Sequence, residues 1–408
     1  MKVDSKFFDM ASAAIHAGGN LNAAHAHLAP IYATSTFTFD SAEQGMNRFT
    51  GKEDGFIYSR FGNPTTSMAA EIIASLEAFG LTGDKENPLQ LKAILHASGQ
   101  AAMATLFLSN LSAGDTVLSH YSLYGGTHEF LFDVLPKYGI KSLIADFRDI
   151  NQLEIIIKEN PSLKLIHIET PANPTMLCID LEAITRIAKQ QGILVSVDNT
   201  FATPYLQPFK YGVDFVFHST TKFLNGHGTA IGGILIGKDI DFMNTTVQKF
   251  YKLLGGNSSP FDAFLLMQGI KTLAVRMEKH CSNAAIVADY LSKHPAIAKV
   301  NYNGLPDHPD YAVSQKQMRQ AGAVMSFELA NGMEAGKQFI NKLAMCVRAV
   351  SVGTVDTLLS HPASMSHSGM TREDRLKSGI TDGLIRMSVG LEAPADILQD
   401  LEQALRIA

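Results

Sequence analysis

A series of short, almost unbroken apolar segments constrains the fold of this chain more than any other feature. Five of them are rich in β-branched residues, leucine and phenylalanine, and they read DTVLSH, KLIHIE, GILVSVD, VDFVFHS and GGILIG. Such runs are typical of strands that are covered on both faces in a parallel sheet. Helical stretches such as LEAITRIAKQQG separate several of them, so the pattern predicts an α/β fold with a doubly wound sheet.

Capping signals mark some helices clearly. Asn63 can cap a helix that begins at Pro64, carries apolar residues on one face and stops at Gly80. The stretch LKAILHASGQ predicts a short buried strand, followed by a tight turn at Gly99 where another helix begins. After residue 255 the pattern changes to long helices and then to mixed strands and helices.

These patterns divide the chain into three parts. Residues 1–59 have no obvious core of their own, and we expect an arm that makes subunit contacts. Residues 60–255 are expected to form the large domain, and residues 256–408 a smaller C-terminal α+β domain.

Charge and composition exclude several classes of partner. A net charge of −5 and a pI near 6.3 argue against nucleic acid or an anionic membrane as the main partner. No apolar run approaches the roughly 20 residues that a membrane-spanning helix needs. The three cysteines lack the spacing of a disulfide framework or a zinc site, and we expect them to be buried apolar residues. We therefore expect a cytoplasmic protein without a metal.

Polar and reactive side chains follow three of the predicted strands at the points where these strands end. Asp198 ends GILVSVD, Ser219, Thr221 and Lys222 follow VDFVF, and Gly99 follows LKAILH. In an open parallel sheet such ends meet at one edge, where ligands bind. A helix N-terminus and hydroxyl groups suit a phosphate. An amine with a carboxylate one strand away suits pyridoxal phosphate, which needs a Schiff-base lysine and an acidic partner for its ring nitrogen.

Seven motifs in order resemble those of the Cys/Met-metabolism family of pyridoxal-phosphate enzymes, the transsulfuration group. They include YSRFGNPT, YGGTHEF, ETPANPT, VDNTFATPYLQPF, HSTTKFLNGHG and LIRMSVGLE. The resemblance covers the chain from about residue 15 to its C-terminus. It implies the aspartate-aminotransferase-like fold (fold type I) and pyridoxal 5'-phosphate as the cofactor.

The resemblance also implies a role for individual residues. Lys222 would form the Schiff base, Asp198 would hold the ring nitrogen, and Tyr124 would stack on the ring and protonate the leaving thiolate. The phosphate would be bound by Gly99, Gln100, Ser219 and Thr221, together with Tyr58 and Arg60 of a neighbouring subunit. The substrate carboxylate would be bound by Arg386, Ser351 and Asn173. A homotetramer built from dimers with shared active sites would follow.

The family includes several reactions, and the motifs leave more than one open. Val350 stands where members that handle cystathionine often carry Glu. This favours a carbon–sulfur lyase acting by γ-elimination on L-methionine or related sulfur amino acids, giving 2-oxobutyrate, ammonia and a thiol. Gly126, in place of a cysteine of such lyases, and the stretch SGQAA are less typical of them, and SGQAA is more typical of O-acylhomoserine sulfhydrylases. Cystathionine gamma-synthases, cystathionine gamma- or beta-lyases, and an aminotransferase of the same fold also remain open.

Overall fold

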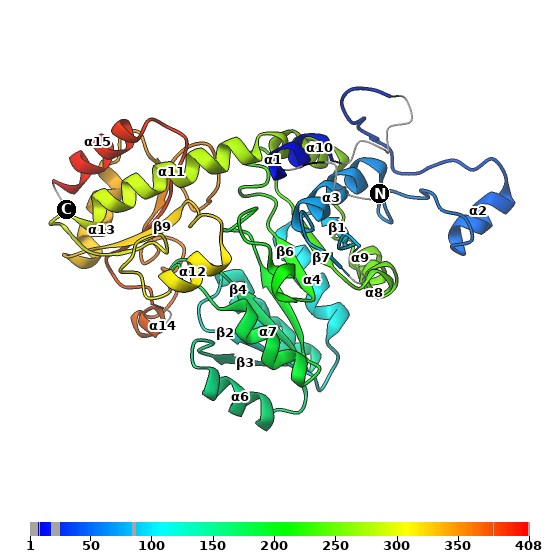
Figure 1. Ribbon diagram of the computed structural model, residues 1–408, viewed down its shortest axis with the longest axis horizontal. Helices are drawn as coiled ribbons and strands as arrows, with labels where there is room; N and C mark the ends of the chain where they lie inside the picture. The colour runs from blue at the N-terminus through cyan, green and yellow to red at the C-terminus, as the bar shows by residue number, and fades with distance from the viewer. Residues whose placement is uncertain (1–6, 8, 18–24, 84–86, 378, 407–408) are drawn as a thin grey trace.

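Two sheets organise the residues that the computed structural model describes, namely 7, 9–17, 25–83, 87–377 and 379–406. The larger sheet has the strand order β1-β7-β6-β5-β4-β2-β3, and the smaller has the order β10-β11-β12-β9-β8 (Figure 1). The strands of the larger sheet are β1 (Lys92–His96), β2 (Thr116–His120), β3 (Lys141–Ala145), β4 (Leu163–Glu169), β5 (Leu194–Asp198), β6 (Phe215–His218) and β7 (Gly233–Gly237). Those of the smaller sheet are β8 (Ile297–Asn301), β9 (Val324–Leu329), β10 (Val347–Arg348), β11 (Leu358–Ser360) and β12 (Leu384–Ser388).

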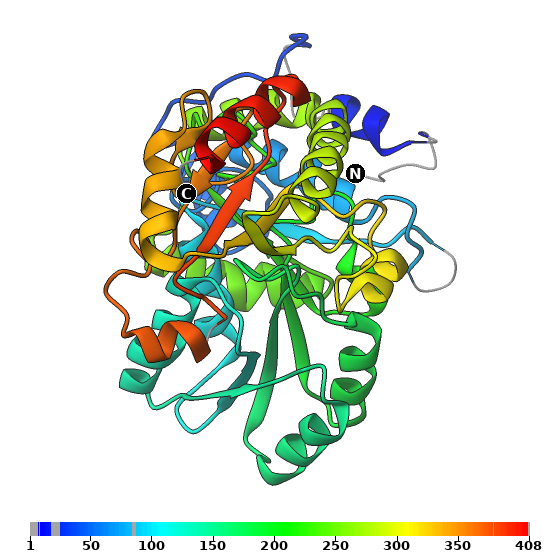
Figure 2. The ribbon, with the colours of Figure 1, turned by 90° about the vertical axis from the view of Figure 1, so that its left-hand side faces the viewer.

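Helices cover both faces of the larger sheet, as expected for a doubly wound fold (Figure 2). In chain order, the helices before residue 255 are α1 (Met10–His16), α2 (Ala42–Phe49), α3 (Pro64–Glu77), α4 (Gly99–Asn110), α5 (Gly125–Glu129), α6 (Ile150–Glu159), α7 (Leu181–Gln190), α8 (Ile240–Phe242) and α9 (Gln248–Leu254). The helices after residue 255 are α10 (Pro260–Lys271), α11 (Leu273–Ser292), α12 (Tyr311–Gln317), α13 (Gly332–Lys342), α14 (Arg372–Lys377) and α15 (Pro394–Leu405). The predicted mixed α/β architecture with a second, smaller sheet is confirmed.

The direction of one strand differs from the expectation. The pairs β2–β3, β2–β4, β4–β5 and β5–β6 are parallel, but β7 runs antiparallel to both β1 and β6. The prediction that GGILIG joins the sheet as a parallel strand is therefore wrong. A continuous apolar run records burial on both faces, and all five residues of β7 are buried, but burial carries no information about direction.

Helix starts follow the signals in the sequence. The Asn63 side chain accepts a hydrogen bond from the Thr65 N–H at 2.9 Å, so that α3 begins at Pro64. Gly80, after the end of that helix, has a φ of +71°, which glycine adopts at little cost. In α4 the Ser98 hydroxyl accepts from the Ala101 N–H at 3.1 Å, and Gly99 is the first helical residue, as predicted.

One apolar cluster of buried residues extends through both sheets. It includes Val197 of β5 and Ile168 of β4 in the larger sheet, and Phe327 of β9 and Ile385 of β12 in the smaller one. The long helix α11 runs from the larger sheet to the smaller (Figure 1) and contacts α10, β8 and α15. The two parts of the molecule are thus held to each other by burial of apolar side chains.

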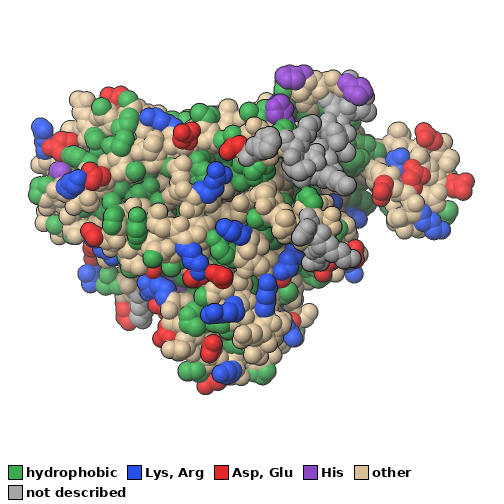
Figure 3. Space-filling view, viewed as in Figure 1, with side chains coloured by type: hydrophobic (Ala, Val, Ile, Leu, Met, Phe, Trp, Pro, Cys, Tyr) green, Lys and Arg blue, Asp and Glu red, His purple; other side chains and the backbone are tan. Residues whose placement is uncertain are grey.

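The first helix, α1, contributes Met10, Ala13 and Ala14 to this core, but the segment from His25 to Gly62 contributes no buried side chain, although the backbone of Gly45 is buried. The segment carrying α2 projects from the body of the molecule, as the ribbon and the space-filling view show (Figures 1 and 3). Met46 and Phe49 of α2 are 55% and 65% exposed, so this projection leaves large apolar side chains uncovered.

Two expectations from the sequence can be compared with the structure, namely that the cysteines are buried and that no helix spans a membrane. Cys178, Cys281 and Cys346 are all free and buried, as expected. Within the described part of the chain, none of the helices combines the length and the apolar character that crossing a membrane requires.

Candidate functional site

A cavity of about 270 Å³ opens at the carboxyl ends of β4, β5 and β6. Eight of the twelve site residues predicted from the sequence line it: Gly99, Gln100, Tyr124, Asn173, Asp198, Ser219, Thr221 and Lys222. These residues come from five separate stretches of the chain. The larger sheet brings them together because its parallel strands end at a common edge.

Lys222 lies in the loop that connects β6 to β7. Its Nζ donates a hydrogen bond to the Ser351 hydroxyl at 2.9 Å. Burial, and secondarily the positive charge of Arg386, lower the pKa of Lys222 to about 8. An amine in this environment is neutral in a substantial fraction of molecules near physiological pH, as a nucleophilic or basic lysine must be.

Two carboxylates end neighbouring strands beside this amine. Glu169 of β4 and Asp198 of β5 are paired in the parallel register of the two strands. The Asp198 carboxylate accepts from the N–H of Thr200 at 3.0 Å and from its hydroxyl at 2.5 Å. Burial raises the pKa of Asp198, and burial together with the charge of Asp198 raises the pKa of Glu169 to about 8. The two acids form one wall of the cavity, and a cationic ligand group beside them would favour their charged forms.

The start of α4 forms a second wall of the cavity. A Cβ added to Gly99 would lie 3.0 Å from the Cβ of Ser219, so a side chain at residue 99 would push the helix start and the strand end apart by a few tenths of an ångström. Among the described residues, no acceptor pairs with the N–H groups of Gly99 and Gln100. Thr221 is different, because its hydroxyl exchanges hydrogen bonds with the backbone of Gly232 at 3.1 and 3.2 Å. The free N–H groups and the Ser219 hydroxyl suit an anion.

Arg386 of β12 belongs to the smaller sheet; neither it nor Ser351 lines the cavity, but each is hydrogen-bonded to a residue that does. It donates to the backbone carbonyls of Val350 and Ser351 and, at 3.3 Å, to the side-chain oxygen of Asn173. Burial lowers the pKa of Arg386 to about 10, which still leaves the guanidinium charged at neutral pH. Lys222, Ser351, Arg386 and Asn173 are therefore joined in one series of hydrogen bonds.

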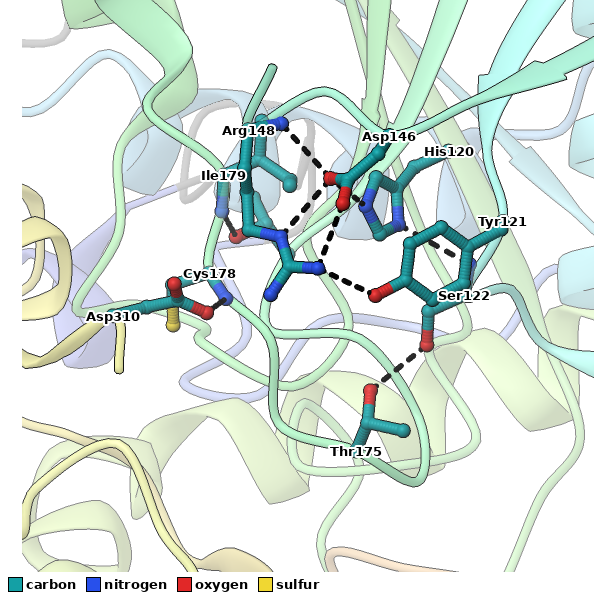
Figure 4. Close-up of polar contacts among 10 residues, drawn as sticks. His120, Tyr121, Ser122, Asp146, Arg148, Thr175, Cys178, Ile179 and Asp310 are labelled. Carbon is teal, nitrogen blue, oxygen red and sulfur yellow. Dashed lines mark hydrogen bonds and ion pairs between the residues drawn. The ribbon is translucent and has the colours of Figure 1, made fainter. Parts of the chain in front are cut away.

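The loop that carries Tyr124 is anchored on the side away from the cavity. Figure 4 shows His120 between Asp146 and the backbone of Ser122, with Arg148 also bonded to Asp146. Because Nδ1 of His120 accepts from the Ser122 N–H, the proton of this neutral ring lies on Nε2, which faces Asp146. Burial lowers the pKa of His120, which agrees with a neutral ring.

Tyr124 itself presents its side chain to the cavity. The residue is 51% exposed, and its N–H donates to Glu169 at 2.7 Å. Among the described residues nothing pairs with its hydroxyl group. The ring is thus available to stack on a planar ligand.

Tyr58 and Arg60 do not line this cavity. Both lie in the segment before α3, where Tyr58 is 39% exposed and Arg60 donates to the carbonyl of Lys252. The Arg60 guanidinium also lies 4.8 Å from the ring centroid of Phe61. These two residues therefore contribute nothing to the cavity of their own chain.

Sequence reasoning missed two residues of the site, Glu169 and Thr200. Thr200 orients Asp198, and its hydroxyl also accepts from the Ser219 N–H at 2.9 Å. Both residues stand in motifs that the family resemblance includes, ETPANPT and VDNT. A usable signal was available for Glu169, because it ends an apolar strand next to the one that Asp198 ends.

The residues of the cavity fit pyridoxal 5'-phosphate. The acidic wall suits a protonated ring nitrogen, the exposed Tyr124 ring suits a planar ring, and the start of α4 suits a phosphate. The partly neutral amine of Lys222 lies between them, within hydrogen-bond distance of Ser351. Among the described residues, no group of three or more His, Cys, Asp or Glu side chains is arranged to hold a metal ion.

Comparisons with known proteins agree with this assignment. Residues 11–406 match the family model described as Cys/Met metabolism PLP-dependent enzyme. The L-methionine gamma-lyase of Porphyromonas gingivalis is 45% identical, over 97% of this chain and 96% of the relative. The L-methionine gamma-lyase of Fusobacterium nucleatum is 44% identical over 99% of each chain. The crystal structure of cystathionine gamma-lyase from Lactobacillus plantarum, complexed with L-serine, has a TM-score of 0.88 at 36% identity, with 98% of each chain covered.

The lowered pKa of Lys222 predicts how its reactivity changes with pH. Trace acetylation of the cofactor-free protein with acetic anhydride, read by peptide mass spectrometry, should give half-maximal labelling of Lys222 near pH 8. A free lysine would give a midpoint near about 10.4. Arg386→Leu removes a neighbouring positive charge, so the midpoint should move to higher pH. A midpoint near that of free lysine, or one that Arg386→Leu does not move, would contradict this account of the amine.

Proposed function

The chain belongs to the Cys/Met metabolism family of PLP-dependent enzymes, and from this we propose that it removes the γ-substituent of L-methionine or a related sulfur amino acid. The products would be 2-oxobutyrate, ammonia and a thiol, so the protein would act as a carbon–sulfur lyase. The observation that carries the proposal is the series of hydrogen bonds joining Lys222, Ser351, Arg386 and Asn173 beside the cavity that Asp198 and Tyr124 line.

Lys222 is proposed to anchor the cofactor and then to move protons. When bound, pyridoxal phosphate supplies an electron sink for the bonds at the α-carbon of the amino acid. Lys222 would attach to the cofactor aldehyde through Nζ and, once released, would take the proton from the α-carbon. Its lowered pKa, to about 8, supports both roles because each needs a neutral amine.

Arg386, Ser351 and Asn173 are proposed to bind the α-carboxylate of the substrate. A guanidinium can hold a carboxylate through two parallel hydrogen bonds. Asn173 and the backbone of Ser351 already contact the Arg386 guanidinium and would keep it in place. The neighbouring Val350 is uncharged and 57% exposed, which supports a substrate whose γ-substituent carries no second amino-acid head.

The remaining predicted residues are proposed to hold the cofactor. Asp198, oriented by Thr200, would pair with the ring nitrogen, and Tyr124 would stack on the ring. The N–H groups of Gly99 and Gln100 and the hydroxyl of Ser219 would bind the phosphate. Thr221 would serve chiefly by holding the loop before β7 through its two hydrogen bonds with Gly232.

Product analysis tests the proposed reaction. Purified protein with pyridoxal phosphate and L-methionine should release 2-oxobutyrate, ammonia and methanethiol in equal amounts. Lys222→Ala should abolish the reaction, whereas Lys238→Ala should not, because Lys238 follows β7 and pairs with Asp214 away from the cavity. A keto acid formed without any thiol would indicate an aminotransferase and contradict the proposal.

Tyr124→Phe tests the proposed proton donor. Loss of a general acid typically slows a reaction by about 10²- to 10⁴-fold, and kcat with L-methionine should fall by such a factor. The absorbance of the bound cofactor should persist, because phenylalanine keeps the aromatic ring. The matched control is Tyr138→Phe, a change at a 59% exposed tyrosine that does not line the cavity. Equal rates in the Tyr124→Phe and native proteins would remove Tyr124 from the chemistry.

A second candidate function rests on the contact between Gln100 and Gly126. A Cβ at residue 126 would lie 1.8 Å from Nε2 of Gln100, so the amide occupies the space that a side chain at 126 would need. An amide is a better partner for an ester oxygen than for a thioether sulfur. This favours γ-replacement on an O-acylhomoserine. Homocysteine formed from O-acetyl-L-homoserine and sulfide, with no 2-oxobutyrate from L-methionine, would establish this second function instead.

The arm is proposed to complete the active site of a second copy of the chain. Its residues from His25 to Gly62 have no buried side chains, and Met46 and Phe49 are exposed. Tyr58 and Arg60 would reach the cofactor phosphate of the partner, in dimers that pair into a homotetramer.

Mixed oligomers test this sharing of sites. Arg60→Ala and Lys222→Ala proteins should each have little activity alone. Co-expressed, they should form hybrids in which one site keeps both residues, so part of the activity should return. Hybrids that form without regaining activity would show that each subunit uses its own Arg60.

A further inference from the structure

Glu169 joins two loops of the site through its two carboxylate oxygens. It is the last residue of β4, and only 5% of it is exposed. Oε2 accepts from the N–H of Tyr124 at 2.7 Å, and Oε1 accepts from the N–H of Asn173 at 2.8 Å. The first of these residues follows β2 and the second follows β4, so one side chain fixes the backbone on both sides of the cavity.

Both of these loops need such an anchor. The Tyr124 hydroxyl makes no hydrogen bond to the described residues, so the position of the exposed ring depends mainly on its backbone. A second contact joins the same loops further from the cavity, where the hydroxyls of Ser122 and Thr175 lie 2.9 Å apart (Figure 4). Glu169 provides the corresponding contact on the cavity side.

No other side chain of this size replaces a carboxylate at this point. Two N–H groups from different directions require two acceptor oxygens, and glutamine offers only one, with an NH₂ group in place of the other. Burial and the neighbouring Asp198 raise the pKa of Glu169, and the N–H groups of Tyr124 and Asn173 oppose that rise because they favour the charged carboxylate. Burying an acid beside another acid costs free energy, and such arrangements are found mainly at functional sites. We therefore expect the positions of the Tyr124 and Asn173 N–H groups to matter for function.

We propose that Glu169 is a positioning residue that sets the Tyr124 ring for the cofactor and Asn173 for the substrate carboxylate by holding their backbone N–H groups. The inference rests on the proposed function only in the roles given to Tyr124 and Asn173. Glu169 itself need not touch the cofactor or the substrate.

Glu169→Gln, with Asp400→Asn as the matched control, tests this proposal. Asp400 is another buried acid, 5% exposed, that accepts from three backbone N–H groups, those of Ala344, Met345 and Cys346, but it does not line the cavity. Both variants lose acceptor capacity for backbone N–H groups and should have lower melting temperatures. Only Glu169→Gln should weaken pyridoxal-phosphate binding, measured by absorbance titration of apoprotein, and raise KM for L-methionine. Displacement of a positioned group can cost up to about 10²-fold, and we expect roughly 10- to 100-fold in each quantity.

Double variants separate positioning from general destabilisation. If Glu169 acts through Tyr124, the effect of Glu169→Gln on cofactor affinity should largely vanish in a Tyr124→Ala background. Its effect on KM should shrink similarly in an Asn173→Ala background. Equal effects in all backgrounds, or unchanged cofactor affinity and KM, would overturn the proposal.

Two further measures keep the test decisive. If Glu169→Gln does not fold, Glu169→Asp can replace it. The aspartate side chain is one methylene group shorter, so its carboxylate lies further from the two N–H groups, and cofactor binding should again be weaker than in the native protein. The affinity measurement uses no substrate, so it stands even if the native protein makes no 2-oxobutyrate from L-methionine. That result would refute the proposed function but not the positioning role toward Tyr124.

Discussion

The parallel pairing of β4 with β5 places two carboxylates side by side, the buried Glu169 and the half-buried Asp198, and the rest of the site is arranged around them. Glu169 and Asp198 are register partners, and burial raises the pKa of each. Like charges in such a place repel each other, so the fold must supply compensating donors. It does so with the N–H groups of Tyr124 and Asn173 for one acid, and with the N–H and hydroxyl of Thr200 for the other. A protonated ring nitrogen beside Asp198 would complete the compensation.

The proposed substrate end of the site depends on contact between the two parts of the chain that form the two sheets. Lys222 belongs to the larger sheet, but its partner Ser351 and the guanidinium of Arg386 belong to the part of the chain that forms the smaller sheet. Arg386 in turn donates a hydrogen bond to Asn173, which lines the cavity. Burial around this series lowers the pKa of both Lys222 and Arg386. Packing that brings the two sheets together therefore also lowers the pKa of the Lys222 amine, as its proposed role requires.

Much of this site could be predicted from the sequence, because strand ends and helix caps are local features. The starts of α3 and α4 and the meeting of Asp198, Ser219 and Lys222 followed from such signals. The direction of β7 did not follow, because an apolar run records burial and not direction. The role of Glu169 depends on two backbone N–H groups from separate loops, which no spacing in the sequence reveals.

Covalent capture of pyridoxal phosphate by Lys222 is the step on which all the other proposed roles depend. Apoprotein should be incubated with the cofactor, reduced with borohydride, digested and analysed by peptide mass spectrometry. The account predicts a single major pyridoxyl label, on Lys222, which disappears in Lys222→Ala. A protein that stays unlabelled, or one labelled mainly on another lysine, would contradict it.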